Sequence, residues 1–168
     1  ILGQAVPKSK KMDLIVQKTA ELGISEIIPF FSSRSIPRLD QRKAAERVRH
    51  WHNITVAAAK QSGTWALPTL DSIMRFQDLV KKEFRDFLKI IFWEDETEAT
   101  LKEVLTANRP LSNIIFLIGP EGGFSTEEVD LAHENGFVPV KLGDTVLRTE
   151  TVSIAVLAII CYEMGKLG

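Results

Sequence analysis

Cysteine and histidine are scarce in this sequence. One cysteine, Cys161, and three histidines stand among 168 residues. A single cysteine cannot form an internal disulfide, and this scarcity is typical of proteins from a reducing compartment such as the cytoplasm. His50 and His52 are two positions apart on a predicted helix, which points their rings in different directions, and His133 stands alone. The sequence therefore predicts no disulfide framework and no metal site.

Long apolar runs are missing as well. The longest run, residues 154–161, is far shorter than the roughly 20 residues that a membrane helix needs. The apolar residues 1–6 are too short for the core of a signal peptide. The sequence therefore predicts no membrane segment and a cytoplasmic location. The chain begins with Ile1 rather than Met, so we expect sequence to be missing upstream.

Charge is balanced overall but unevenly distributed. The net charge is −1, yet residues 34–60 carry seven basic residues against two acids, a local charge of +5. A basic segment of this kind is typical of surfaces that bind a polyanion such as RNA. A solvated helix face is the alternative. The basic residues are Arg34, Arg38, Arg42, Lys43, Arg47, Arg49 and Lys60.

Apolar segments of strand length alternate with amphipathic segments of helical period. This alternation predicts an α/β fold, with a mainly parallel sheet and helices on both faces. Ligands of such sheets bind outside the carboxyl ends of the strands, which here are followed by residues 119–124 and 143–151. The expected strands are residues 1–6, 26–31, 88–93, 113–118 and 137–142, and the expected helices are residues 10–22, 40–61, 72–82, 98–107, 125–135 and 150–164.

The first of these loops is rich in glycine. It reads IGPEGGFS (residues 118–125), and Ser125 with Glu128 predicts a capping box that starts a helix. The spacing fits neither a phosphate-binding P-loop nor the dinucleotide fingerprint GxGxxG, and no GxSxG elbow occurs. The glycines either serve a tight turn or let a ligand approach the backbone at a helix N-terminus.

The second loop places polar residues at the start of an almost entirely apolar helix. It reads LGDTVLRTET (residues 142–151). Polar groups at the mouth of a buried helix are costly unless they are used or paired. In the structural alternative, Thr149 or Thr151 caps the helix and Arg148 pairs with Glu150.

Taken together, the two loops resemble the SPOUT-class methyltransferases, and most closely the bacterial family that methylates N3 of a uridine in 16S ribosomal RNA. Residues 7–35 (PKSKKMDLIVQKTAELGISEIIPFFSSRS) and 57–63 (AAAKQSG) are similar to that family too. The resemblance implies a trefoil knot near the C-terminus and a homodimer whose site is completed across subunits. It also implies that residues 1–168 form the methyltransferase domain, without the family's N-terminal PUA-like RNA-binding domain.

The resemblance further implies S-adenosylmethionine as cofactor, held mostly by backbone, and an RNA substrate. Glu150 is expected to accept or position the N3 proton, and Arg148 to stabilise negative charge on a uracil oxygen or a phosphate. The residues expected at the cofactor are Ile118, Gly119, Pro120, Glu121, Gly122, Gly123, Leu142, Gly143, Leu147, Arg148 and Thr149. The residues expected at the RNA are Arg34, Arg38, Arg42, Arg49, Lys60 and Gln61.

Two other functions stay open at this point. One is another SPOUT enzyme, acting on tRNA or on a ribose 2′-oxygen, although LRTET (residues 147–151) favours the uridine-N3 family. The other is an RNA- or nucleotide-binding module without catalysis. Free 16S RNA and the assembled small ribosomal subunit are equally open as substrates.

Overall fold

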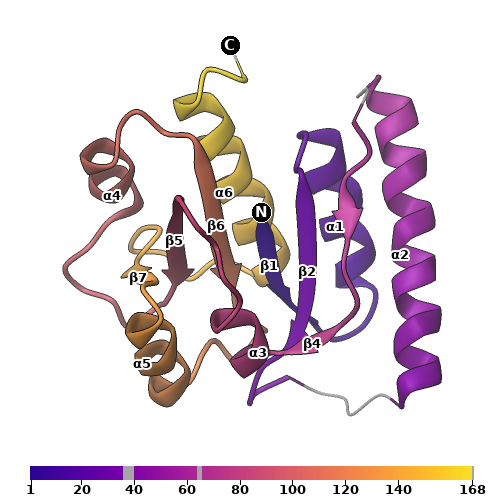
Figure 1. The fold of residues 1–168 in the computed structure, drawn as a ribbon, viewed down its shortest axis with the longest axis horizontal. Helices are drawn as coiled ribbons and strands as arrows, with labels where there is room; N and C mark the ends of the chain where they lie inside the picture. Colours follow the sequence, from indigo (N-terminus) through magenta and orange to yellow (C-terminus); the bar gives the residue numbers. More distant parts are fainter. Residues whose placement is uncertain (36–39, 64–65, 168) are drawn as a thin grey trace.

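The protein is a parallel sheet between two layers of helices (Figure 1). The computed structural model describes residues 1–35, 40–63 and 66–167. The strand order is β3-β2-β1-β6-β5-β7, with β4 also paired to β2, and every described pair is parallel. The expected α/β class with a mainly parallel sheet is thus confirmed. The strands are β1 Leu2–Ala5, β2 Glu26–Phe31, β3 Thr69–Leu70, β4 Met74–Arg75, β5 Phe87–Phe92, β6 Asn113–Ile118 and β7 Val138–Val140.

Each face of the sheet has its own apolar core because side chains alternate along every strand. On β6, Phe116 belongs to the core under α1, α4 and α6, whereas Leu117 belongs to the core under α3 and α5. Strands buried on both faces read as continuous apolar runs, which explains the composition of β6. The helices are α1 Lys11–Glu21, α2 Gln41–Ser62, α3 Phe76–Val80, α4 Leu101–Ala107, α5 Thr126–Glu134 and α6 Thr149–Glu163.

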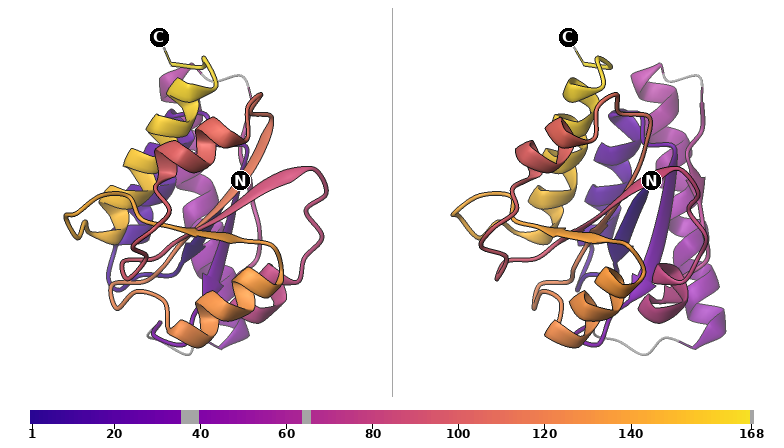
Figure 2. Two further views of the ribbon diagram at one scale, coloured as in Figure 1. Left: turned by 90° about the vertical axis from the view of Figure 1, so that its left-hand side faces the viewer. Right: turned by 60° about the vertical axis from the view of Figure 1, so that its left-hand side comes forward.

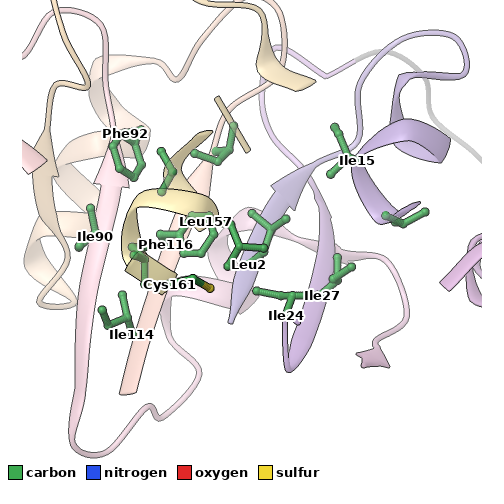
Figure 3. Close-up of a cluster of buried hydrophobic side chains, with 14 of the residues drawn as sticks. Leu2, Ile15, Ile24, Ile27, Ile90, Phe92, Ile114, Phe116, Leu157 and Cys161 are labelled. Atoms are coloured by element: carbon green, nitrogen blue, oxygen red, sulfur yellow. The ribbon is translucent and has the colours of Figure 1, made fainter. Parts of the chain in front are cut away.

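Helix α6 packs over the two central strands. Figure 3 shows Leu157 and Cys161 of α6 beside Leu2 of β1 and Phe116 of β6. Because α6 follows β7 and lies over β1 and β6, its first turn lies at the edge of the sheet where those strands end. The loop that leads into α6 is therefore placed next to the loop that follows β6.

Several local signals predict the helix ends correctly. Asp40 caps α2 by accepting the N–H of Lys43 at 2.8 Å, and Gly63 ends that helix with φ +71°. The capping box of Ser125 and Glu128 is present at the start of α5. These contacts lie within four residues of one another, which is why the sequence pattern reveals them.

The expected helix over residues 72–82 is largely wrong. Residues 74–75 form the short strand β4, and only Phe76–Val80 is helical. Met74 pairs with Phe30, which lies 44 positions earlier in the chain. A helical pattern in a short window cannot reveal such a long-range partner, and tertiary pairing overrides local propensity here.

Two further expectations concern the whole chain. The trefoil knot stays a prediction. None of the helices in the described part of the chain is both long and apolar enough to cross a membrane.

Candidate functional site

A cavity of about 540 Å³ opens at the carboxyl ends of β5, β6 and β7. Its size is that of a small-molecule site, and its position is the one expected for a ligand of a parallel sheet. The loops before α4 and α6 lie at the same side of the molecule in both views of Figure 2. The lining comprises Lys11, Phe92, Trp93, Glu94, Glu96, Thr97, Ile118, Gly119, Pro120, Glu121, Gly123, Phe124, residues 140–149 and Val152.

The predicted cofactor residues gather around this cavity. Ten of the eleven line it, and Gly122 is the exception. The sequence reasoning missed the third wall, which residues 92–94, 96 and 97 supply at the end of β5 and in the loop after it. The same argument about strand ends applies to β5, but that loop carries no glycine motif to draw attention to it.

Two of the three glycines in the turn are required by its geometry. Gly123 has φ +66°, and its N–H donates to the carbonyl of Pro120 at 2.9 Å. A Cβ on Gly119 would lie 3.2 Å from the ring of Phe124. A Cβ on Gly122 would make only ordinary contacts of 3.6 Å with Arg34. The turn is therefore tight, with the Phe124 ring packed against Gly119 and the Glu94 carboxylate against Gly123.

The loop after β2 holds this turn from outside. Arg34 Nη1 donates to the carbonyl of Gly122 at 2.7 Å. Next to it, the buried carboxylate of Glu128 accepts the backbone N–H of Ser33 at 2.7 Å and the Ser33 hydroxyl at 2.9 Å. Arg34, expected at the RNA, thus also supports the glycine turn.

A buried chain of hydrogen bonds joins the two predicted loops through the central strand. Thr149 Oγ1 donates to the carbonyl of Gly119 at 2.7 Å and accepts from Gln4 Nε2 at 3.1 Å. Ser153 Oγ donates to Gln4 Oε1. Gln4, Thr149 and Ser153 are all buried, and a fully satisfied network of this kind rigidifies its surroundings. Sequence reasoning missed Gln4 and Ser153, although a glutamine in a buried strand is itself a signal.

The structural alternative for the second loop is wrong in both parts. Arg148, not a threonine, is the N-cap residue of α6, and it makes no side-chain capping bond. Glu150 pairs with Lys11 rather than with Arg148, at 3.6 Å between Oε2 and Nζ. Lys11 lies 139 positions away in the sequence, so the spacing of residues 148–151 could not reveal it.

Lys11 lies between two carboxylates. Its Nζ is also 3.0 Å from Glu121 Oε1. Burial opposes the charge of Glu121, but the hydrogen bonds from its own backbone N–H, from Lys11 and from the Lys8 N–H together hold the pKa of Glu121 below its usual value. The Glu150 side chain is 13% exposed, and its buried Oε2 has no hydrogen-bond partner among the described residues.

Three basic side chains line the cavity: Lys11, Lys141 and Arg148. Lys11 is neutralised by its two carboxylates, and Lys141 Nζ lies 3.4 Å from Asp144 Oδ1. Arg148 is exposed, and within the described ranges no hydrogen bond or ion pair engages its side chain. Arg148 therefore brings the cavity's uncompensated positive charge. Among the residues that the structure describes, no group of three or more His, Cys, Asp or Glu side chains could hold a metal ion.

The residues expected at the RNA do not form one group. Arg34 lies at the glycine turn, and Arg38 lies outside the described residues. Arg42 and Arg49 are exposed on α2. Lys60 and Gln61 lie in the last turn of that helix, which spans 22 residues, about 33 Å at 1.5 Å per residue. Since α2 runs from the end of β2 back toward its start, these two side chains lie at the sheet edge opposite the cavity.

Comparison with known proteins gives consistent matches along the chain. A family model described as an RNA methyltransferase domain matches residues 1–161. The Ribosomal RNA small subunit methyltransferase E of Bacillus subtilis is 32% identical over 167 residues, covering 96% of this chain. The protein of that name from Neisseria gonorrhoeae, whose crystal structure holds S-adenosyl methionine, superimposes with a TM-score of 0.86 at 33% identity over 96% of this chain.

A putative methyltransferase from Legionella pneumophila, solved with bound SAM, superimposes with a TM-score of 0.88 at 34% identity, again over 96% of this chain. The chain spans only part of these proteins: 65% of the Bacillus protein and 64% of each solved chain. The residues that match the family model, 1–161, include every residue that lines the cavity.

Proposed function

The chain belongs to the RNA methyltransferase domain family, and we propose that it transfers a methyl group from S-adenosylmethionine to N3 of a uridine in 16S ribosomal RNA. The observation that carries this proposal is the cavity itself. Two of its walls are the loops whose sequences resemble the uridine-N3 family, and these loops follow β6 and β7, the two parallel strands that flank β5. The names of two relatives, which are 32% and 31% identical, support small-subunit ribosomal RNA as the substrate.

The residues around the cavity fit the methyl donor, which supplies a methyl group on a positively charged sulfur. Ile118 and Val140 are buried and form an apolar interior, and Leu142 and Leu147 offer apolar side chains to an adenine ring. Gly143 has open space where a side chain would stand, so a ligand in the cavity can approach its backbone there. Cofactor sites commonly combine an apolar interior with a few placed polar groups.

Arg148 and Glu150 serve the acceptor in this proposal. Uracil N3 carries a proton and is a poor nucleophile until that proton leaves, so a proton acceptor and a stabiliser of negative charge are both required. Arg148 has no ion-pair partner within the described ranges, and its guanidinium suits an anionic uracil oxygen or a phosphate. Glu150 Oε2 lacks a hydrogen-bond partner among the residues that the structure describes and so keeps its capacity to accept a proton, while Lys11 holds the carboxylate in place.

The RNA would approach the cavity past the loop after β2 and the start of α2. Arg34 and Arg42 lie toward the sheet edge at which the cavity opens, and both are exposed. Arg49 follows on α2. Basic side chains on such a path bind phosphates without reading sequence, and they make the affinity depend on salt. Ribosomal RNA as substrate is in keeping with a cytoplasmic location.

A homodimer and a trefoil knot complete the proposal. Helix α6 exposes Ile159 by 39% and Tyr162 by 67%, and a second copy of the chain would cover such apolar side chains. The proposed knot lies near the C-terminus, where the loop after β6 and the segment before α6 come together. The bond between Thr149 and Gly119 holds those two segments together.

The direct test is methyl transfer from labelled S-adenosylmethionine to small ribosomal subunits, or to free 16S RNA, from cells that lack the gene. We expect label in the RNA as 3-methyluridine. Label on a ribose oxygen, or in tRNA only, would assign the protein to another SPOUT activity. Donor binding without any transfer would instead support a binding module.

A further inference from the structure

Four carboxylates line the cavity: Glu94, Glu96, Glu121 and Asp144. Three of them are engaged. Glu96 Oε1 accepts the backbone N–H groups of residues 97, 98 and 99 at 2.7–3.3 Å. Glu121 pairs with Lys11, and Asp144 lies 3.4 Å from Lys141 Nζ. Glu94 has no hydrogen bond or ion pair within the part of the chain that the structure describes. Among the four carboxylates, Glu94 is thus the one without a partner in the described residues.

The carboxylate of Glu94 is aimed at the glycine turn from the opposite loop. Its Oε1 lies 3.1 Å from the position that a Cβ on Gly123 would occupy. Two residues earlier, Phe92 is buried at the end of β5, whereas Glu94 is exposed. Glu94 therefore stands at the rim of the cavity, outside its apolar interior, where a hydrated charged group of a ligand would remain in contact with solvent.

We propose that Glu94 binds the ammonium group of the methyl donor's amino acid part. This inference rests on the proposed function and adds a residue that recognises the donor. An ammonium group offers three N–H donors to a carboxylate, whereas a sulfonium offers none. Charge-assisted hydrogen bonds are the stronger kind and fix orientation. With the ammonium at the rim, the adenosine part of the donor occupies the apolar interior.

Three ligands separate this contact from the rest of the donor. S-adenosylmethionine and S-adenosylhomocysteine both carry the ammonium group, and only the first carries the sulfonium. 5′-Methylthioadenosine lacks the amino acid part altogether. Binding of each to the purified protein is measured by calorimetry for the wild type, for Glu94→Gln and for Asp95→Asn. Asp95 is the matched control, because it is exposed, adjacent in sequence and absent from the cavity lining.

We expect Glu94→Gln to lower the affinity for both S-adenosylmethionine and S-adenosylhomocysteine by about tenfold, because one charge-assisted contact is lost. Methylthioadenosine should bind the variant as it binds the wild type, and Asp95→Asn should bind all three normally. The assignment is overturned if Glu94→Gln binds both S-adenosylmethionine and S-adenosylhomocysteine with wild-type affinity. It is also overturned if the variant loses affinity for S-adenosylmethionine alone, or if it loses affinity for methylthioadenosine to the same extent. A wild type that binds neither S-adenosyl ligand would refute the proposed function itself, and thermal melting of Glu94→Gln checks that the variant is folded.

Discussion

Thr149 donates a 2.7 Å hydrogen bond from its hydroxyl to the carbonyl oxygen of Gly119, 30 residues earlier in the chain. The bond joins the first residue of α6 to the first residue after β6. Gln4, from the central strand, donates to the same hydroxyl. The two loops that form the cavity are therefore fixed to each other and to the sheet by one buried group.

Replacing Thr149 with Val should loosen this junction. The carbonyl of Gly119 and the amide of Gln4 would each lose a buried partner, so we expect a loss of about 1–3 kcal/mol in the free energy of unfolding. Donor binding should weaken as well, because the loops lose their fixed spacing. Urea denaturation and calorimetry measure the two effects.

Thr149→Ser keeps the hydroxyl and should retain most of the donor affinity. Thr151→Val is the matched control, since Thr151 is exposed on the same helix. If Thr149→Val were no less stable than Thr151→Val, the buried network would not hold the loops as described.

Gly123→Val should abolish binding of S-adenosylmethionine. A β-branched residue is strained at φ +66°, and its Cβ would meet the carboxylate of Glu94 at 3.1 Å. Gly122→Ala should bind nearly normally, because a Cβ there makes only ordinary contacts and Gly122 lies outside the cavity lining. Calorimetry that gave equal affinities for wild type and Gly123→Val would remove the turn from the donor site.

Glu150→Ala should retain donor binding and lose methyl transfer. Glu150 does not line the cavity, so its loss leaves the donor's contacts in place. A missing proton acceptor typically costs about 10²–10⁴-fold in rate, which a single-turnover transfer assay with saturating donor detects. Glu134→Ala, an exposed helical glutamate, serves as the control. Transfer at the wild-type rate by Glu150→Ala would remove Glu150 from the mechanism.

Glu121 should make stability depend on pH in acid. Its pKa is lowered from the ordinary value of 4.5 in the folded protein, so its stabilising contribution is present above pH 4.5 and is lost as the pH falls through the folded-state pKa. Urea denaturation of wild type and Glu121→Gln at a series of pH values should show a stability difference that shrinks below pH 4.5. A difference that is constant with pH, or that grows in acid, would mean that Lys11 and Lys8 do not stabilise the charged carboxylate.

Much of the fold could be predicted because its signals are local. The strands β2 and β6 have the predicted bounds. Capping residues such as Asp40 lie within a few positions of the N–H groups from which they accept hydrogen bonds. Strand order could not be predicted, because it depends on pairings across the whole chain. The missed strand β4 is one example, since Met74 is held by Phe30.

The site divides in the same way. The loops after β6 and β7 were predicted because they follow strand ends and resemble a family. The pairing of Glu150 with Lys11 joins the end of the chain to its beginning, so the neighbours of Glu150 suggested Arg148 instead. Glu94 was missed because the sequence cannot show that a carboxylate at the cavity has no partner among the described residues.

The most direct test of the proposed activity is mass spectrometry of 16S ribosomal RNA from cells with and without the gene. We predict that deletion removes one 3-methyluridine, that the wild-type gene restores it, and that Glu150→Ala does not. An unchanged set of 16S modifications after deletion, or loss of a methyl group from a ribose or from tRNA instead, would contradict the assignment.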